Sequence, residues 1–310
     1  MSAAFADAAA AMPVRDRALS GNRRPQRSPR QRGTTPTETR THPDTDPRRY
    51  EPSETPTMSA ILLETTDRVL LATLNRPQQL NAFNGELFDG LAQAFIDAAT
   101  DDSVRVLLLT GAGRAFTAGA DLTEVARPGA PQKHGFAGLC RAIVDFPKPF
   151  VLAVNGLGTG LGATICGLAD FTYMAASARL RCPFSTLGLT AEAGSTFTFP
   201  LLMGRQRAAW FLMASEWLSA ADCVHAGLAL DVLPDDALMA HARAKAAQLA
   251  ALPPASLATT KKLMLAPMRE QLLQAIDAEN AALAKLVGGP ANREALRAFA
   301  EKRQAGFSAL

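Results

Sequence analysis

Between residues 150 and 169 the chain reads FVLAVNGLGTGLGATICGLA, an apolar run with glycine at every second position from Gly156 to Gly162. The four apolar residues 151–154, followed by Asn-Gly, predict a short buried strand that ends in a turn. Backbone without side chains lets a ligand approach main-chain N–H groups, and the small apolar residues 161–168 predict a buried helix. The unpaired N–H groups at the start of such a helix favour negative charge. We therefore expect the chemistry of this chain to lie here.

Two other structures compete for this stretch. Twenty residues with few polar groups are long enough for a transmembrane helix, but the glycines, the β-branched start and the preceding Pro147-Lys148-Pro149 favour a strand and a turn. A dinucleotide-binding loop needs G-x-G-x-x-G with an acidic residue about 20 positions later. Here the spacing is G-x-G-x-G-x-G and Asp170 comes too soon. The strand followed by a buried helix is therefore the favoured interpretation.

Composition limits the classes of protein to which the chain can belong. Of its 310 residues, 48% are hydrophobic and 20% are charged, which is enough for a sizeable globular core. The net charge of +3 belongs to residues 1–57, because the remainder has 22 basic and 22 acidic residues. The alkaline pI therefore gives no reason to expect a nucleic-acid-binding body.

The four cysteines form no C-x-x-C pair, and the four histidines show no metal-ligand spacing. We therefore expect reduced, mostly buried thiols, a cytoplasmic location and no metal site.

Residues 1–57 differ in composition from the rest of the chain. They contain eight prolines and ten arginines and show almost no periodic apolar pattern, so we expect a disordered extension. The Arg-rich start weakly resembles an organellar transit peptide. A start site placed too far upstream is the simpler account, because the first structured pattern begins at Met58. We expect the chain from Met58 onward to fold and act without this extension.

Up to about residue 190 the apolar pattern alternates between strand and helix, as in α/β proteins. Asn84 is a suitable N-cap for one helix, whose apolar face includes Leu87, Leu91 and Phe95. Residues 114–122 follow a strand and show no period, so we expect a loop at the place where α/β proteins bind ligands. The expected strands are 61–74 (a hairpin joined at 66–68), 104–110, 150–154, 171–175 and 179–182, and the expected helices are 84–99, 134–146 and 161–168.

From Gly194 onward the pattern is helical almost to the end of the chain, with breaks at glycines and prolines. Leu272, Ile276, Leu283 and Leu286 form an apolar face in this region. We expect such a face to pack on another subunit.

Five motifs occur in order along the chain: Asn75-Arg-Pro-Gln-Gln-Leu-Asn-Ala82, Gly113-Arg-Ala-Phe-Thr-Ala-Gly-Ala-Asp-Leu122, Pro147-Lys-Pro149, Asn155-Gly156 with its glycine loop, and Ser219-Ala-Ala-Asp-Cys-Val-His-Ala-Gly-Leu228. On these motifs the chain from about Ser59 resembles the crotonase family, the enoyl-CoA hydratase/isomerase superfamily. The resemblance implies an α/β fold, with a crotonase-like ββα spiral core over residues 58–250. It also implies a C-terminal α-helical region over residues 251–310 that assembles homo-trimers, often paired as hexamers.

The resemblance also implies an acyl-CoA thioester as substrate and no separate cofactor, because coenzyme A is part of that substrate. Two backbone N–H groups, at Ala118 and Leu161, are expected to hold the thioester oxygen. Preorganised donors of this kind stabilise the negative charge that proton loss next to a thioester creates. The residues expected to contact CoA are Ala82, Ala120, Asp121, Leu122 and Lys261, with Lys262 as a possible substitute for the last.

The hydratases of this family use two glutamates, and Thr164 and Phe184 stand at the matching positions. Residues 183–200 instead resemble the peroxisomal-type Δ3,Δ2-enoyl-CoA isomerases, whose single glutamate matches Glu192. One carboxylate suffices for that isomerisation, because the same group can remove and return the proton. Apolar neighbours would raise its pKa. The alternatives are a solvated glutamate ahead of a helix, a hydratase, and a non-catalytic acyl-CoA-binding protein.

Overall fold

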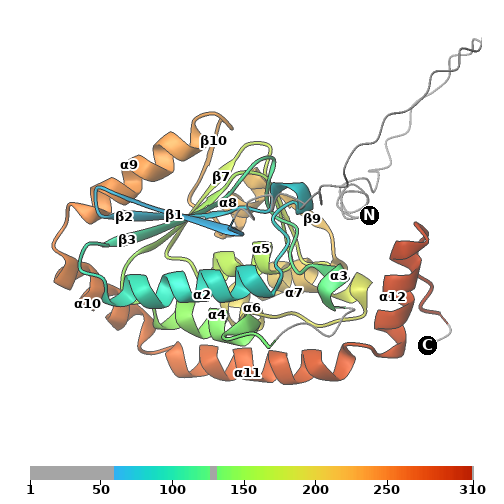
Figure 1. Ribbon diagram of the computed structural model, residues 1–310. Helices are drawn as coiled ribbons and strands as arrows, with labels where there is room; N and C mark the ends of the chain where they lie inside the picture. The colour runs from blue at the N-terminus through green and yellow to red at the C-terminus, as the bar shows by residue number, and fades with distance from the viewer. Residues whose placement is uncertain (1–58, 126–130, 309–310) are drawn as a thin grey trace, which may run out of the picture. The chain divides into compact units, whose positions relative to one another are not determined.

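Two β-sheets organise the computed structural model, which describes residues 59–125 and 131–308 (Figure 1). The larger sheet has the strand order β1-β2-β3-β5-β7-β10, and the smaller has the order β4-β6-β8-β9. All neighbours are parallel except β1 with β2 and β8 with β9. The expectations for residues 1–57 lie outside the described residues. The strands are β1 (Ile61–Thr66), β2 (Val69–Leu74), β3 (Val106–Gly111), β4 (Ala115–Thr117), β5 (Phe150–Val154), β6 (Leu157–Thr159), β7 (Phe171–Ala175), β8 (Arg179–Arg181), β9 (Trp217–Ser219) and β10 (Asp231–Leu233).

From β3 to β8, consecutive strands alternate between the two sheets. The pairs β3 and β4, β5 and β6, and β7 and β8 each give one strand to the larger sheet and one to the smaller, and helical turns follow each pair. This arrangement confirms the expected ββα spiral. The helices are α2 (Gly85–Thr100), α3 (Leu122–Val125), α4 (Gly135–Asp145), α5 (Leu161–Thr164), α6 (Ser195–Met203), α7 (Arg205–Ala214), α8 (Ala220–Ala226), α9 (Leu238–Ala250), α10 (Pro254–Leu265), α11 (Arg269–Leu286) and α12 (Pro290–Ala300), with 3₁₀ turns η1 (Pro77–Gln79), η2 (Ile165–Gly167) and η3 (Ser185–Leu187).

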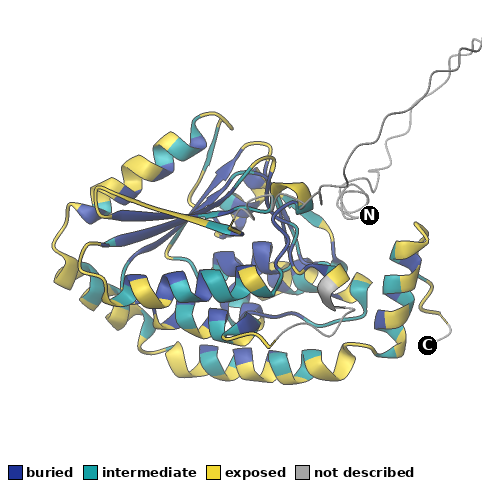
Figure 2. Ribbon diagram, in the orientation of Figure 1, coloured by how far each residue is buried: buried dark blue, intermediate teal, exposed yellow. Residues whose placement is uncertain are grey.

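The core lies around the central strands of the larger sheet, which are buried on both faces (Figure 2). Helix α9 packs against β2, β3, β5 and β7, while α2 and α4 pack together on the other side of the sheet in Figure 1. Asn84 caps α2 by accepting the N–H of Leu87 (3.0 Å), as expected. The ring of Phe95 from α2 meets Phe146 and Phe150 edge to face, with centroids 5.2 and 4.8 Å apart. These aromatic contacts join α2 to the start of β5.

Several short elements escape the sequence pattern. The expected loop 114–122 contains β4, and the glycine run contains β6 and the short helix α5, which continues into η2. The transmembrane interpretation of residues 150–169 is therefore wrong. Two further strands, β9 and β10, interrupt the helical last third. Three-residue strands carry too few residues for a period to be recognised. Every helix of the described residues is too short or too polar to cross a membrane.

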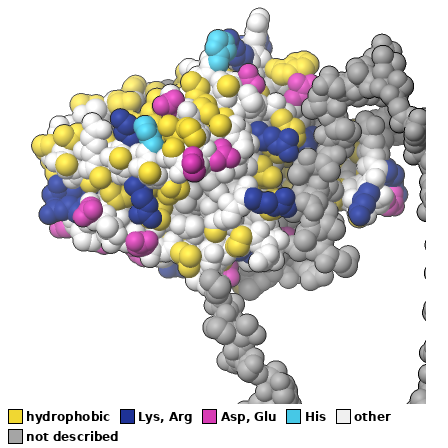
Figure 3. Space-filling model, turned by 90° about the horizontal axis from the view of Figure 1, so that it is seen from above, with side chains coloured by type: hydrophobic (Ala, Val, Ile, Leu, Met, Phe, Trp, Pro, Cys, Tyr) yellow, Lys and Arg dark blue, Asp and Glu magenta, His cyan; other side chains and the backbone are white. Residues whose placement is uncertain are grey.

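The apolar face of α11 is largely used within the chain. Leu272 and Ile276 are buried, and an added Cβ at Gly194 would lie 2.4 Å from Leu272 Cδ1. The expectation that these two side chains face another subunit is therefore wrong, whereas Leu286 is 40% exposed. On the molecular face shown in Figure 3, basic and acidic side chains are interspersed, in agreement with the balanced charge after residue 57.

Asn155 joins the connection after β5 to the connection after β3. Its side chain accepts the N–H of Gly111 (3.1 Å) and donates to the carbonyl of Gly113 (2.9 Å). The next residue, Gly156, lies so close to this connection that an added Cβ would be 2.2 Å from the carbonyl oxygen of Arg114. The Asn-Gly pair therefore sets the distance between two chain connections.

We expect Gly156→Ala to lower the free energy of unfolding by more than about 2 kcal/mol, because its methyl group collides with backbone that cannot move aside cheaply. Gly306→Ala is the matched control, since no atom lies within 4 Å of the added carbon. It should change stability by less than about 0.5 kcal/mol. Urea unfolding at constant pH measures both, and equal stabilities would contradict the close approach.

Candidate active site

Two chain connections lie side by side at the carboxyl ends of β4 and β6. The two strands are parallel, so the residues that follow them leave the smaller sheet next to each other. The Thr159 hydroxyl donates to the carbonyl of Ala118 (2.6 Å), and a Cβ added at Gly160 would lie 3.9 Å from Gly119 Cα. Gly119 has a φ of +81°, and a side chain there would come within 2.7 Å of the Thr159 carbonyl oxygen. Glycine is therefore required where the connections meet.

Ala120 presents a free backbone donor in the first connection. It forms a parallel bridge with Phe83, in which the Phe83 N–H donates to Gly119 (2.7 Å) and the Asp121 N–H donates to Phe83 (2.9 Å). In this pattern the N–H of the bridged residue itself points to the opposite side. Within the described residues it has no hydrogen-bond partner.

The donor expected at Ala118 is wrong. Its backbone N–H already donates to the carbonyl of Leu80 at 2.9 Å, so it is not available to a ligand. Gly119 is in the left-handed region and turns the chain between the two alanines. Residue type alone does not distinguish these alanines, and only the backbone conformation shows that Ala120 has the free N–H.

Leu161 presents a second free donor, in the connection beside Ala120. It is the first residue of α5, and the N–H groups of Ala163 and Thr164 both donate to the carbonyl of Gly160 (2.8 and 3.0 Å). The N–H of Leu161 precedes the first helical hydrogen bond and has no partner within the described part of the chain. Leu161 thus keeps the free N–H that the sequence analysis expects.

Glu192 lies between η3 and α6 and is only 6% exposed. Its carboxyl group is hydrogen-bonded to the Thr164 hydroxyl, with 2.5 Å between the two oxygens. Thr164 ends the short helix that begins at Leu161, so the residue that binds the carboxyl group follows Leu161 by about one helical turn. The alternative of a solvated glutamate is contradicted by this burial.

Burial raises the pKa of Glu192 to about 8, because the charged form loses its hydration. The Thr164 hydrogen bond opposes the increase, and the charge of Glu279 adds to it. Burial also raises the pKa of the Cys140 and Cys182 thiols, and the charge of Glu192 contributes at both. No described cation is among the groups that shift the pKa of Glu192. Its carboxyl group is therefore able to exchange a proton near neutral pH.

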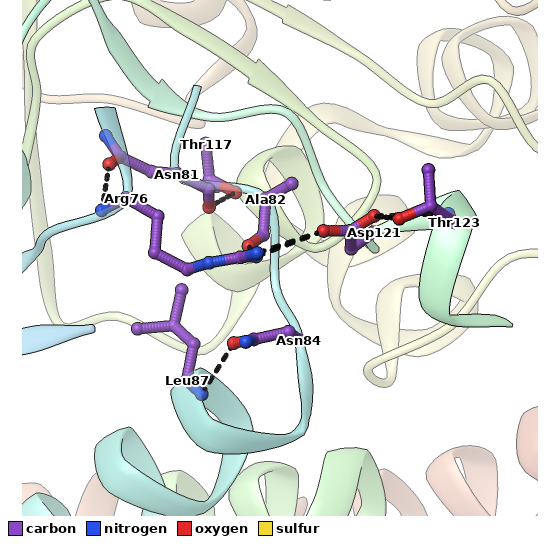
Figure 4. Close-up of polar contacts among 8 residues, drawn as sticks. All are labelled: Arg76, Asn81, Ala82, Asn84, Leu87, Thr117, Asp121 and Thr123. Carbon is purple, nitrogen blue, oxygen red and sulfur yellow. Dashed lines mark hydrogen bonds and ion pairs between the residues drawn. The ribbon is translucent and has the colours of Figure 1, made fainter. Parts of the chain in front are cut away.

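Arg76 lies among the residues expected to contact CoA (Figure 4). Its guanidinium forms an ion pair with Asp121 (3.2 Å) and donates to the carbonyl of Ala82. Asp121 also accepts the N–H and the hydroxyl of Thr123 (3.1 and 2.6 Å). Burial disfavours the Asp121 charge, but the hydrogen bonds from Thr123 and Arg76 outweigh it and lower its pKa. Ala82 and Asp121 thus lie together around Arg76, and Ala120 directly precedes Asp121 in the chain.

Asn81 fastens this cluster to the sheet connections (Figure 4). Its fully buried side chain accepts the Arg76 N–H (2.9 Å) and donates to the carbonyls of Ala112 and Ala115 (2.9 and 2.8 Å). The Thr117 hydroxyl donates to the backbone carbonyl of Asn81 (2.7 Å). The polar residues of the 75–82 motif therefore satisfy buried backbone groups.

Lys261 lies near the amino ends of β5 and β7, two inner strands of the larger sheet. Its ammonium group forms an ion pair with Asp170 (2.6 Å) and donates to the carbonyl of Lys148 (2.9 Å). Lys148 precedes β5 and Asp170 precedes β7, whereas the free N–H groups follow strands. Lys261 and the two free N–H groups thus lie at different ends of their strands within one chain, and the expected contact between Lys261 and CoA stays a prediction. Lys262 is exposed, and Leu122 is half-buried at the start of α3.

Comparisons with known proteins match most of the chain. The family described as enoyl-CoA hydratase/isomerase matches residues 64–309. Enoyl-CoA delta isomerase 2 of Rattus norvegicus is 33% identical over 222 residues, which are 68% of this chain and 56% of that protein. The 2,3-dehydroadipyl-CoA hydratase of Escherichia coli (strain K12) is 34% identical over 253 residues, which are 81% of this chain and 99% of that protein. Isomerases and hydratases are thus about equally similar to it.

A solved structure shows the same arrangement of elements. The crystal structure of an enoyl-CoA hydratase/isomerase from Pseudoalteromonas atlantica T6c has a TM-score of 0.78 to this chain at 34% identity. The match covers 80% of this chain and 100% of the other.

We expect Glu192→Gln to stabilise the fold at high pH. The folded-state pKa of about 8 lies above the ordinary value of 4.5, so the wild type loses stability as the pH rises between these values. The neutral amide avoids this loss, and the difference should reach on the order of 5 kcal/mol above pH 8 and vanish below pH 4.5. Denaturant unfolding from pH 4 to 9 measures it, with Glu270→Gln on the exposed side of α11 as the control. A difference that does not change with pH would show that Glu192 is not buried as a neutral acid.

Proposed function

This chain belongs to the enoyl-CoA hydratase/isomerase family, the crotonase superfamily, and we propose that it is an enoyl-CoA isomerase. The proposed reaction moves the double bond of a 3-enoyl-CoA to the 2-trans position. The observation that carries the proposal is the buried carboxyl group of Glu192, which is hydrogen-bonded to Thr164 on the short helix that begins at Leu161.

In the proposed mechanism the N–H groups of Ala120 and Leu161 donate to the thioester oxygen. Both belong to connections that hydrogen bonds and glycine contacts hold in place, so little reorganisation is needed when charge develops on that oxygen. Donors of this kind contribute about 3 kcal/mol each to transition-state stabilisation. Because the donors are backbone groups, substitutions at these two positions act mainly through shape.

Glu192 supplies the proton transfer in this proposal. Its carboxylate removes a proton from C2, which leaves a dienolate whose negative charge lies on the thioester oxygen. The same carboxyl group then returns the proton to C4. This step restores the thioester carbonyl and leaves the new double bond between C2 and C3. A raised pKa suits both steps, because the group must release the proton as readily as it accepts it. No cofactor enters the reaction.

Hydration is the competing activity, and a hydratase is among the relatives reported above. It requires a group that activates water in addition to the group that handles the carbon proton. Thr164 and Phe184 occupy the positions of the hydratase glutamates, and both are buried. The Thr164 hydroxyl is already bonded to Glu192. These two residues favour isomerisation over hydration.

We expect Glu192→Gln to lower kcat for 3-enoyl-CoA isomerisation by a factor on the order of 10² to 10⁴ while acyl-CoA binding survives. The amide keeps the shape of the side chain but cannot take a proton. For the wild type, kcat/KM should rise with pH and level off near pH 8, where the free carboxyl group becomes ionised. Absorbance of the conjugated 2-enoyl thioester measures turnover, and calorimetry measures binding.

The control for this experiment is Glu270→Gln, an equal chemical change at an exposed position of α11. Near-normal isomerisation by Glu192→Gln would show that another group carries the proton. Addition of water to 2-enoyl-CoA as the main reaction of the wild type would favour the hydratase. Binding without any turnover would favour a non-catalytic acyl-CoA-binding protein.

A homo-trimer, or a hexamer of two trimers, is also part of the proposal. Large hydrophobic side chains are exposed on three helices: Leu201 on α6 (59%), Trp210 and Met213 on α7 (61% and 69%), and Leu263 and Met264 on α10 (68% and 69%). Clusters of exposed apolar side chains are typical of subunit interfaces. The cytoplasmic location stays a prediction.

We expect light scattering at micromolar concentration to give about three or six times the chain mass of 32.8 kDa. Burial of the exposed apolar side chains between copies would provide the driving force. A mass equal to one chain would contradict the proposed assembly.

A further inference from the structure

Glu279 is a second buried carboxylate, and it lies on α11 in the C-terminal part of the chain. It is only 5% exposed. Its two oxygens accept the backbone N–H of Gly194 (2.6 Å), the backbone N–H of Thr196 (2.9 Å) and the Thr196 hydroxyl (2.6 Å). These donors belong to the first turn of α6 and the residue before it. A side chain with three donors at a helix start is fixed in position by them.

The backbone that Glu279 holds begins two residues after Glu192. Ala193 and Gly194 have φ values of +58° and +71°, and a left-handed conformation is unfavourable for alanine. Such a conformation persists only where surrounding contacts hold it. Ser195 closes the turn, because its hydroxyl donates to the carbonyl of Glu192 (2.7 Å).

Packing adds to these hydrogen bonds. Leu272 and Ile276 lie on the same helix as Glu279, and both are within 4 Å of a Cβ built on Gly194. Helix α11 runs beside α6 and α4 (Figure 1). One helix of the C-terminal region therefore contacts the 192–196 segment through both apolar side chains and a charged acceptor.

We propose that Glu279 is a positioning residue: its carboxylate holds the backbone of Gly194 and Thr196 so that the Glu192 carboxyl group stays against Thr164. The packing of α11 and the position of Glu192 then depend on the same contacts. The proposal rests on the proposed function only for its activity readout.

The charge of Glu279 makes a second contribution, which separates this role from simple structural support. It adds to the increase in the pKa of Glu192 that burial causes. Within the described residues, the other groups that interact with Glu192 are the Thr164 hydroxyl from α5, the Cys140 thiol from α4 and the Cys182 thiol after β8. Burial raises the pKa of both thiols and keeps them neutral. Removal of the Glu279 charge should therefore lower the pKa of Glu192. Loss of packing would lower it as well, by admitting water, so the two effects are separated by Thr196→Val, which weakens the turn but keeps the charge.

The first experiment needs no substrate. The free energy of unfolding is measured against pH for the wild type, Glu192→Gln, Glu279→Gln and the double variant. The change caused by Glu192→Gln is then compared with and without Glu279→Gln. With Glu279→Gln, this change should level off at a pH lower by on the order of one unit, because ionised Glu192 no longer faces a second charge. Glu270→Gln, on the same helix, is the matched control and should leave the curve in place. An unshifted curve with Glu279→Gln would overturn the electrostatic part of the proposal.

The second experiment measures isomerisation. Glu279→Gln should lower kcat at least tenfold, because one oxygen that accepts a hydrogen bond becomes an amide group that opposes the donors of the turn. It should also move the acid limb of the pH profile to lower pH, because the negative charge is lost. Thr196→Val keeps the charge but removes one donor, so it should lower kcat without moving the pH profile. It also serves as the test if Glu279→Gln does not fold. Wild-type kcat in both variants would overturn the proposal. Absence of isomerisation in the wild type would refute the proposed function but not the substrate-free result.

Discussion

The close approach of two backbone connections is the constraint on which the rest of the site depends. Gly156 lies against the Arg114 carbonyl and Gly119 lies against the Thr159 carbonyl, at distances that leave no room for a Cβ. Such an approach would bury unpaired polar groups if Asn81 and Asn155 did not satisfy them. The parallel pairing of β4 and β6 then places the following residues side by side. The free N–H groups of Ala120 and Leu161 are a consequence of this geometry.

The two buried carboxylates show how surroundings separate chemically identical groups. Glu279 accepts three hydrogen bonds at the start of α6, whereas Glu192 has one hydrogen bond, to Thr164, and no cation among the groups that shift its pKa within the described residues. Hydrogen bonding to the charged form favours ionisation, and desolvation opposes it. The same side chain is thus suited to holding a backbone turn in one place and to exchanging a proton in the other. Ionisation of the buried Glu192 is expected to reduce the stability of the fold, as desolvated groups at functional sites commonly do.

The sequence predicted an element correctly where its residue pattern was long enough to indicate which side chains are buried and where the element begins. The hairpin turns at Asp67 and Arg68, helix α2 begins after its Asn84 cap, and β5 has the expected bounds. It failed for the three-residue strands, which are held by pairing with distant segments. It also failed for Ala118, because a donor is defined by the direction of an N–H group and not by a side chain. The ion pair of Lys261 with Asp170 could not be predicted either, because the two residues are 91 positions apart in the sequence.

The sequence by itself determined the alternating αβ pattern, the family resemblance, the absence of carboxylates at positions 164 and 184, and Glu192 as the candidate proton-transfer group. These are properties of residue type and spacing. Only the tertiary structure decided which alanine has a free N–H, that Glu192 is buried against Thr164, and that Glu279 holds the turn beside it. Each of these depends on groups 28 to 85 residues apart, and hydrogen bonds and desolvation at such separations exist only after the chain has folded.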